Sequence, residues 1–170
     1  MQNLLQSIEI ITENIKNSFM KVDINTCIKD YNNKNIIVIG DIILDTYVLG
    51  NVNRISQEAP VPIVSMQKKD FKPGGAANVA INLSNLGASV TLIGVSGFDS
   101  NHIKLIETLN NHKNIKTRII QCDDRPTTIK TRIIANNRQL VRLDDEIIKP
   151  IRNEIENKII DICKSICPNA

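Results

Sequence analysis

Two aspartates and a pair of glycines are the residues of this chain whose types and spacing suit the binding of a ligand. Asp41 and Asp45 follow the apolar run at residues 36–39, which ends at Gly40 and has the pattern of a buried parallel strand. In open α/β sheets ligands bind beyond the carboxyl ends of the strands, so both carboxylates are placed to accept hydrogen bonds from ligand hydroxyl groups. Two aspartates that only shape a turn are the alternative interpretation.

A glycine-rich turn is predicted after Pro73, where Gly74 and Gly75 can adopt positive φ and bring bare backbone close to a ligand. A helix of small and apolar residues is predicted from 76 to 86, ended by a glycine C-cap. Asn78 lies in the first turn of this helix, where backbone amides lack intrahelical partners. These groups would form a polar corner suited to a polar ligand. An ordinary unit in which the glycines only turn the chain has the same pattern.

The pattern of apolar and β-branched residues predicts an α/β fold with one main sheet. The strands expected in this sheet are residues 36–40, 90–95 and 115–121, with a second glycine turn at 94–97. The helices expected after residue 87 are 103–109, capped by Asp99 or Ser100, and 151–166, with Pro150 at its first position.

A separate antiparallel layer is predicted from residues 46–66 and 127–144. Asn136 and Asn137 suit the two-residue turn of the second hairpin, because Asn tolerates positive φ. This hairpin carries four basic side chains, which form either a solvated strand face or a clamp for a phosphate group. They are Lys130, Arg132, Arg138 and Arg142.

Residues 1–34 are predicted to be an accessory segment, with an amphipathic helix over 1–20 and a polar linker after it. The segment has no basic start before a continuous apolar core, and no run approaches the roughly 20 apolar residues of a membrane span. We therefore expect a cytoplasmic protein that has no membrane partner.

Composition excludes several classes of function. The net charge of +3 is small and the aromatic content is 3%, so neither a basic surface nor a stacking surface for nucleic acid is expected. Cys163 and Cys167 are four residues apart on a helical pattern, but no His lies near them, so we expect reduced thiols and no metal site. No Gly-x-Gly-x-x-Gly follows a strand, which argues against a dinucleotide-binding domain.

Residues 72–97 resemble the first signature of the ribokinase-like (PfkB-type) carbohydrate kinases. The matching positions are Gly74, Gly75, Ala76, Asn78, Ala80, Gly87 and Gly97. Two further segments are similar to the kinases of this family that phosphorylate D-glycero-β-D-manno-heptose 7-phosphate. They are GDIILDTYVLGNVNRISQEAPVPIV and PTTIKTRIIANNRQLVRLDDE, and the resemblance spans Asn35 to about Glu146.

The resemblance implies an open Rossmann-like sheet with a small β lid, within a kinase domain over residues 35–170 whose lid segments are about 46–66 and 127–144. It implies that one or two of the four basic residues of the hairpin contact the sugar's phosphate. For the intact enzyme it implies ATP and Mg²⁺, which would serve to phosphorylate the anomeric hydroxyl in the synthesis of ADP-heptose and the lipopolysaccharide core. The residues that it places at the sugar are Asp45, Gly74, Gly75 and Asn78, with Asp41 and Arg54 as further candidates.

A kinase of this family also needs a Gly-Ala-Gly-Asp loop, whose aspartate removes a proton from the accepting hydroxyl. All seven glycines lie at or before Gly97, so these 170 residues hold no such loop. We expect a chain truncated on its C-terminal side, with the acceptor-binding part and without catalytic residues or an ATP pocket. Such a chain would form a homodimer through the lid or be complemented by a C-terminal half. A degenerate, non-catalytic fragment that acts only as a dimerisation or interaction module is the alternative.

Overall fold

The computed structural model describes residues 29, 31, 32 and 34–167, which form two sheets with helices packed beside them. The main sheet has the order β1-β4-β5 and is parallel throughout. Its strands are β1 (Asn35–Ile39), β4 (Ser89–Gly97) and β5 (Ile115–Cys122). The second sheet has the order β3-β2-β6-β7. Its strands are β2 (Ile42–Ile55), β3 (Pro62–Gly75), β6 (Thr128–Ala135) and β7 (Arg138–Asp145).

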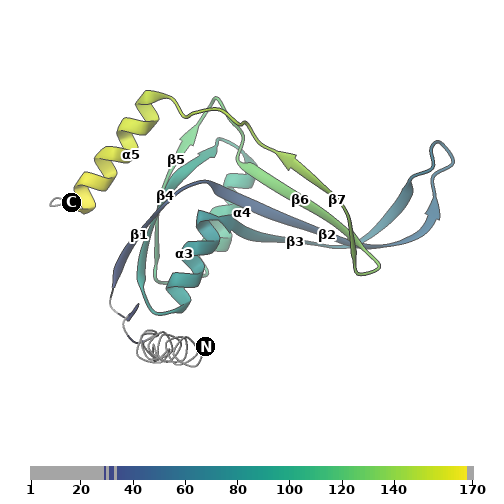
Figure 1. The fold of residues 1–170 in the computed structure, drawn as a ribbon, viewed down its shortest axis with the longest axis horizontal. Coiled ribbons are helices and arrows are strands. Elements are labelled where there is room, and N and C mark those ends of the chain that lie inside the picture. Colours follow the sequence, from purple (N-terminus) through teal and green to yellow (C-terminus); the bar gives the residue numbers. More distant parts are fainter. Residues whose placement is uncertain (1–28, 30, 33, 168–170) are drawn as a thin grey trace, which may run out of the picture.

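The core lies where the helices α3 (Ala76–Asn85) and α4 (Ser100–Leu109) meet β4 and the start of β2. Ala77 and Ala80 are fully buried, and their small side chains let α3 approach the sheet closely. A third helix, α5 (Asn153–Ile166), follows the second sheet (Figure 1). The buried cluster consists of Ile42, Leu44, Ala77, Ala80, Ala88, Val90, Leu92, Leu105 and Leu109.

The second sheet projects sideways from the main sheet, with the β2–β3 hairpin at its far end (Figure 1). Strand β2 begins three residues after β1 ends, so the chain passes from one sheet into the other almost without a loop. Leu44 near the start of β2 is fully buried, whereas Asn53 to Ile55 at its end are exposed. The first residues of this strand, Ile42 to Thr46, therefore belong to the core, and the rest of the strand forms the projecting layer.

The predicted main sheet is confirmed, but the second sheet differs from the prediction in two respects. It is mixed rather than antiparallel, because β2 pairs with β3 antiparallel and with β6 parallel. Its first two strands also have 14 residues each and exceed the predicted limits of 46 and 66. Pairing over the whole length of both strands satisfies backbone groups that a short hairpin would leave open.

Both predicted glycine turns are wrong, since the residues concerned end strands. Gly74 and Gly75 pair with Ile43 and Ile42, so β3 runs directly into α3. Only Gly75 of the two has positive φ, at 56°. Residues 94–97 likewise continue β4 and pair with β5 as far as Gly97 and Cys122.

The helix boundaries are mostly as predicted. Asp99 caps α4, and Gly87, with φ 98°, follows the end of α3. In the hairpin, Asn136 and Asn137 have φ of 49° and 61°, as their type predicts. The predicted start of the last helix is wrong, because α5 begins at Asn153 after the cap residue Arg152, and Pro150 lies outside it. The helix predicted over residues 1–20 and most of the linker after it lie outside the described residues.

Asp99 links the segment after β4 to the residue before β6 through hydrogen bonds. Its Oδ1 accepts hydrogen bonds from the backbone amides of Asn101 at 3.0 Å and His102 at 2.9 Å, and its Oδ2 accepts one from the amide of Thr127 at 2.7 Å. The Thr127 hydroxyl in turn accepts a bond from the amide of Gly97 at 3.1 Å. Burial opposes ionisation of this carboxyl group, but the hydrogen bonds from Thr127, His102 and Asn101 outweigh it and lower the pKa of Asp99.

We expect this carboxylate to make stability depend on pH in acid. Because the pKa of Asp99 is lowered by folding, its contribution is complete above the unfolded value and is lost as the pH falls below about 4. The free energy of unfolding, measured by urea titration, should therefore differ more between the native chain and Asp99→Asn at pH 6 than at pH 3. A difference that stays constant or grows towards pH 3 would contradict this assignment.

Candidate functional site

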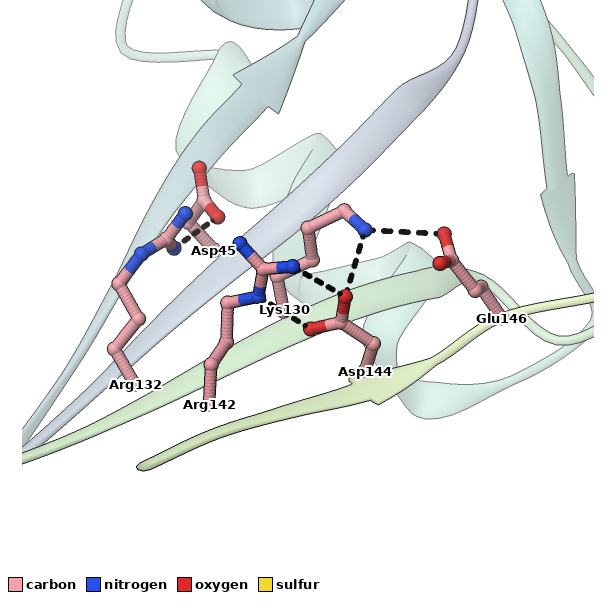
Figure 2. A network of polar contacts seen from close by, with 6 residues as sticks. All are labelled: Asp45, Lys130, Arg132, Arg142, Asp144 and Glu146. Carbon is pink, nitrogen blue, oxygen red and sulfur yellow. Dashed lines mark hydrogen bonds and ion pairs between the residues drawn. The ribbon is translucent and has the colours of Figure 1, made fainter. Parts of the chain in front are cut away.

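Charged side chains from three strands converge on one face of the second sheet (Figure 2). The register sets Asp45 of β2 beside Lys130 of β6, and Lys130 beside Asp144 of β7. Side chains alternate between the two faces of a strand, so residues in register share a face. The opposite face carries Leu44 and Thr46, which are buried. The charges thus lie on the face that does not pack on the core.

Asp45 lies over a glycine that leaves room for its carboxylate. Gly74 is its neighbour across the β2–β3 ladder, two residues from the direct partner Lys72, and a Cβ built on Gly74 would overlap Oδ2 of Asp45. The Asp45 side chain is 18% exposed and forms an ion pair with Arg132, in which Nη1 donates to Oδ1. This bond raises the pKa of Arg132 above its ordinary value.

The other charges form a second group, separate from the Arg132–Asp45 pair (Figure 2). Lys130 donates to Asp144 and to Glu146, both at 3.1 Å, and Arg142 donates to both oxygens of Asp144 at 2.9 and 3.0 Å. The bonds to Glu146 and Asp144 raise the pKa of Lys130. Desolvation opposes ionisation of Asp144, but the bonds from Lys130 and Arg142 outweigh it and lower its pKa. Each cation in this group therefore already faces a carboxylate.

A cavity of about 450 Å³ adjoins this face at the carboxyl end of the main sheet. Asp41, Val95 and Lys130 line it, so it lies between the two sheets, where ligands bind in open α/β folds. Its other wall is the connection from β7 to α5, and Arg125 holds this connection by donating to the carbonyl groups of Lys149 at 3.2 Å and Pro150 at 3.1 Å. The volume is in the range of small-molecule sites.

The sequence-predicted sugar contacts divide into a near and a distant set. Asp41 lines the cavity, and its carbonyl group accepts the amide of Ala76 at 2.9 Å, which joins it to the start of α3. Asn78, in the first turn of the same helix, is exposed, and neither it nor Asp45 lines the cavity at Asp41. Arg54 lies nine residues beyond Asp45 along β2, roughly 30 Å at strand spacing, and is not brought to the same place.

The four candidate phosphate-binding residues do not all lie in one group. Lys130, Arg132 and Arg142 lie in the charged groups described above. Arg138 follows the hairpin turn, six residues from Asp144 along β7, and forms no ion pair within the part of the chain that the structure describes. It lies beside a different cavity, at Val52 and Pro62.

Sequence reasoning missed the residues that balance the basic ones. Asp144 and Glu146 were visible in the segment RLDDE, and their charge, opposite to that of Arg142 and two and four residues after it, was the signal that could have found them. Tyr47 was also missed: the Lys72 ammonium and the Arg132 guanidinium each lie 5.4 Å from its ring centroid. Both contacts join residues of different strands, so no pattern within one stretch of the sequence predicts them.

Metal-ligating clusters and membrane-spanning helices are both absent from the residues that the structure describes. Residues 29, 31, 32 and 34–167 contain no cluster of three or more His, Cys, Asp and Glu side chains that could hold a metal ion. Over the same residues, no helix has the length and apolar character needed to cross a membrane.

A parallel sheet with helices packed beside it, and a second sheet with a charged face next to its carboxyl edge, define an α/β domain with a cavity of ligand size. The family model described as pfkB family carbohydrate kinase matches residues 33–166 of the chain. The chain therefore belongs to the pfkB family of carbohydrate kinases.

Curated relatives place the chain within a part of longer proteins. It is 46% identical over 126 residues to a "Bifunctional protein HldE" of Coxiella burnetii (strain RSA 331 / Henzerling II), which covers 74% of this chain and 26% of the relative. It is 44% identical over 117 residues to the protein of the same name in Vibrio vulnificus (strain YJ016), covering 69% and 24%. The chain thus spans about a quarter of the length of these relatives.

Solved structures confirm the fold. The structure titled "Crystal Structure of Sa239" matches with a TM-score of 0.60 and 20% identity, over 82% of this chain and 44% of that one. The ribokinase of Giardia lamblia matches with a TM-score of 0.58 and 14% identity, over 76% and 42%. The fold is accordingly ribokinase-like, and the matched region is less than half of each of these proteins.

Proposed function

We propose that this segment is the acceptor-binding part of a sugar-phosphate kinase that resembles the heptose 7-phosphate kinases. The observation that carries the proposal is the position of Asp45, whose carboxylate pairs with Arg132 on the strand face that also carries Lys130 and Arg142, near the start of the second sheet. Identity of 46% to a bifunctional protein HldE and the heptose-kinase-like segments around Asp45 and Arg132 support the same substrate class.

The chemistry of a sugar phosphate suits this face. A carboxylate only accepts hydrogen bonds, and Arg132 occupies Oδ1 of Asp45, so the group retains acceptor positions for sugar hydroxyls. Lys130 and Arg142 lie in the adjacent charged group, where a phosphate would take the place of Asp144. Lys130 and Arg142 would then face Asp144 in the free protein and the phosphate in the complex, so the charge of both cations is balanced in either state.

The donor side of the reaction is not built from these residues. A kinase of this type uses ATP and Mg²⁺, but the 170 residues hold no Gly-Ala-Gly-Asp loop and the described residues hold no metal-ligating cluster. We therefore assign no step of phosphoryl transfer to this chain. A cytoplasmic location fits the proposal, because sugar phosphates and ATP are cytoplasmic substrates.

Titration with D-glycero-β-D-manno-heptose 7-phosphate, followed by NMR shift changes that report weak binding, tests this function. Asp45→Ala and Asn78→Ala should each weaken binding by about 1–3 kcal/mol, because each removes hydrogen bonds to the sugar. Asp145→Ala is the matched control, since this exposed carboxylate follows Asp144 on β7 and so lies on the other face. Unchanged affinity in both test variants, or no binding by the native chain, would contradict the proposal.

A second candidate, an interaction module, is favoured by exposed apolar strand surface. Strand β7 is an edge strand whose eight residues are all exposed, and Leu143 on it is 55% exposed. Strand β1 is also an edge strand, and Ile39 at its end is 55% exposed. Open edges with apolar side chains promote pairing with another chain. We propose that the segment pairs through these edges, either with a second copy or with a polypeptide that completes the kinase fold.

The chain is therefore expected to self-associate when it is alone. Sedimentation velocity at increasing concentration should show dimers or larger species, and Leu143→Lys should shift the distribution towards monomer if β7 mediates pairing. Glu156→Lys, an exposed charge change on α5, serves as the control. A monomer at all concentrations would exclude pairing with a second copy and leave only pairing with a different polypeptide.

A further inference from the structure

Arg132 is less accessible to solvent than Arg142, the other arginine of the charged face, whereas Lys130 is about as buried as Arg132, at 19% exposed. The Arg132 side chain is 23% exposed and its partner Asp45 is 18% exposed, whereas the side chain of Arg142 is 50% exposed. An anion approaching from solvent therefore meets Arg142 more readily than Arg132. To reach Arg132 it would also have to break a partly buried, charge-assisted hydrogen bond, the stronger kind of hydrogen bond in proteins.

The strand register shows that this pairing is selective. The direct neighbour of Asp45 on β6 is Lys130, yet Lys130 turns to Asp144 and Glu146 on the other side. Arg132, two residues further along β6, reaches back to Asp45 instead (Figure 2). The carboxylate is thus paired with the cation that has a planar guanidinium group rather than with the nearest one.

Both sides of this ion pair are fixed by their surroundings. On the Arg132 side, the guanidinium lies 5.4 Å from the centroid of the Tyr47 ring. It therefore contacts both the aromatic ring and the Asp45 carboxylate. On the Asp45 side, Oδ2 occupies the space that a side chain on Gly74 would need. The carboxylate therefore lies between the Arg132 guanidinium and Gly74 of β3, with one oxygen towards each.

Building on the proposed function, we infer that Arg132 is a positioning residue, which orients the Asp45 carboxylate for the sugar hydroxyls and does not bind the phosphate. The sugar's phosphate then belongs to the exposed Arg142, with Lys130 beside it on the same carboxylate, Asp144. This division separates the two parts of the substrate: one carboxylate with its guanidinium for the hydroxyls, and one cation pair for the phosphate.

The two roles predict different responses to the phosphate of the ligand. We would titrate the full chain with heptose 7-phosphate and with the same heptose lacking the phosphate, using NMR shift changes. For a positioning residue, Arg132→Gln should weaken both ligands by the same factor, about tenfold or more, since it disturbs a hydrogen-bonding carboxylate. Arg142→Gln, the matched control, should weaken only the phosphorylated ligand. Loss confined to the phosphorylated ligand in Arg132→Gln would overturn the inference.

A double-mutant cycle gives an independent reading. If Arg132 acts through Asp45, Arg132→Gln should have no further effect in an Asp45→Ala background, whereas two independent contacts would give losses that multiply. If the native chain binds neither ligand, or neither Asp45→Ala nor Asn78→Ala changes the affinity for either ligand, the proposed function fails and this inference fails with it. If Asp45→Ala weakens binding but the two losses multiply, the proposed function stands and the inference alone is wrong.

Discussion

No ADP is expected to form when a polypeptide of these 170 residues is incubated with ATP, Mg²⁺ and heptose 7-phosphate. Removing a single electrostatic donor from a catalytic site typically lowers the rate by about 10²–10³. Here the sequence lacks the entire Gly-Ala-Gly-Asp loop, since no glycine follows Gly97. The group that would deprotonate the acceptor hydroxyl and the backbone amides that would stabilise the transferring phosphoryl group are missing together. Turnover should fall below detection.

The measurement is ADP release in a coupled assay, with the HldE protein of Coxiella burnetii assayed in parallel under the same conditions. The chain carrying Asp45→Ala is the control for contaminating ATPase, because contamination is unaffected by this change. Turnover near the 1–100 s⁻¹ typical of kinases, reduced in Asp45→Ala, would show that another group among these residues serves as the base. The assignment of this segment to acceptor binding alone would then be wrong.

The main sheet could be predicted because its signals are local. Residues 36–39 are a short apolar run, and the other two parallel strands are rich in isoleucine, valine and threonine, which is recognisable without knowledge of their neighbours. The cap at Asp99 and the positive φ of Asn136 and Asn137 are also local, since each depends on one or two residue types. These features were found where the sequence placed them.

The second sheet could be predicted only in outline, because its extent depends on pairing between distant segments. Residues 72–75 have the composition of a turn, yet the ladder with residues 42–45 holds them in a strand. The tertiary partner prevailed over the local preference. Likewise the parallel pairing of β2 with β6 joins segments more than 80 residues apart and leaves no trace in either segment alone.

The candidate site shows the same limit. The residue types at Asp45 and Arg132 each suggested a role, a sugar contact and a phosphate contact. The structure joins these two residues, which are 87 apart in the sequence, in one ion pair, and the sequence contains no signal for this contact. The glycine signature treats Gly74 and Gly75 as one pair, but the structure needs glycine at the two positions for different reasons. Gly75 has a positive φ, and Gly74 leaves space for the Asp45 carboxylate.

This difference predicts unequal effects of adding one methyl group at adjacent positions. At Gly75, alanine would have to adopt φ near 56°, and its Cβ would overlap the carbonyl oxygen of Asp41, which is backbone and cannot move aside. The left-handed conformation and the overlap together should lower the free energy of unfolding by about 2–5 kcal/mol. A loss of this size is a large part of the stability of a small domain, so Gly75→Ala is expected to unfold much of the chain.

At Gly74, alanine would overlap mainly the carboxylate of Asp45, which is a side chain. The expected loss is about 1–3 kcal/mol, and it should shrink when Asp45→Ala removes the obstructing group. Urea unfolding of the two single glycine variants, of Asp45→Ala and of the two double variants measures both effects. Because Asp45→Ala leaves the Asp41 carbonyl in place, it should rescue Gly74→Ala and not Gly75→Ala. Equal rescue at both positions, or none at Gly74, would show that Gly74 does not serve to make room for the Asp45 carboxylate.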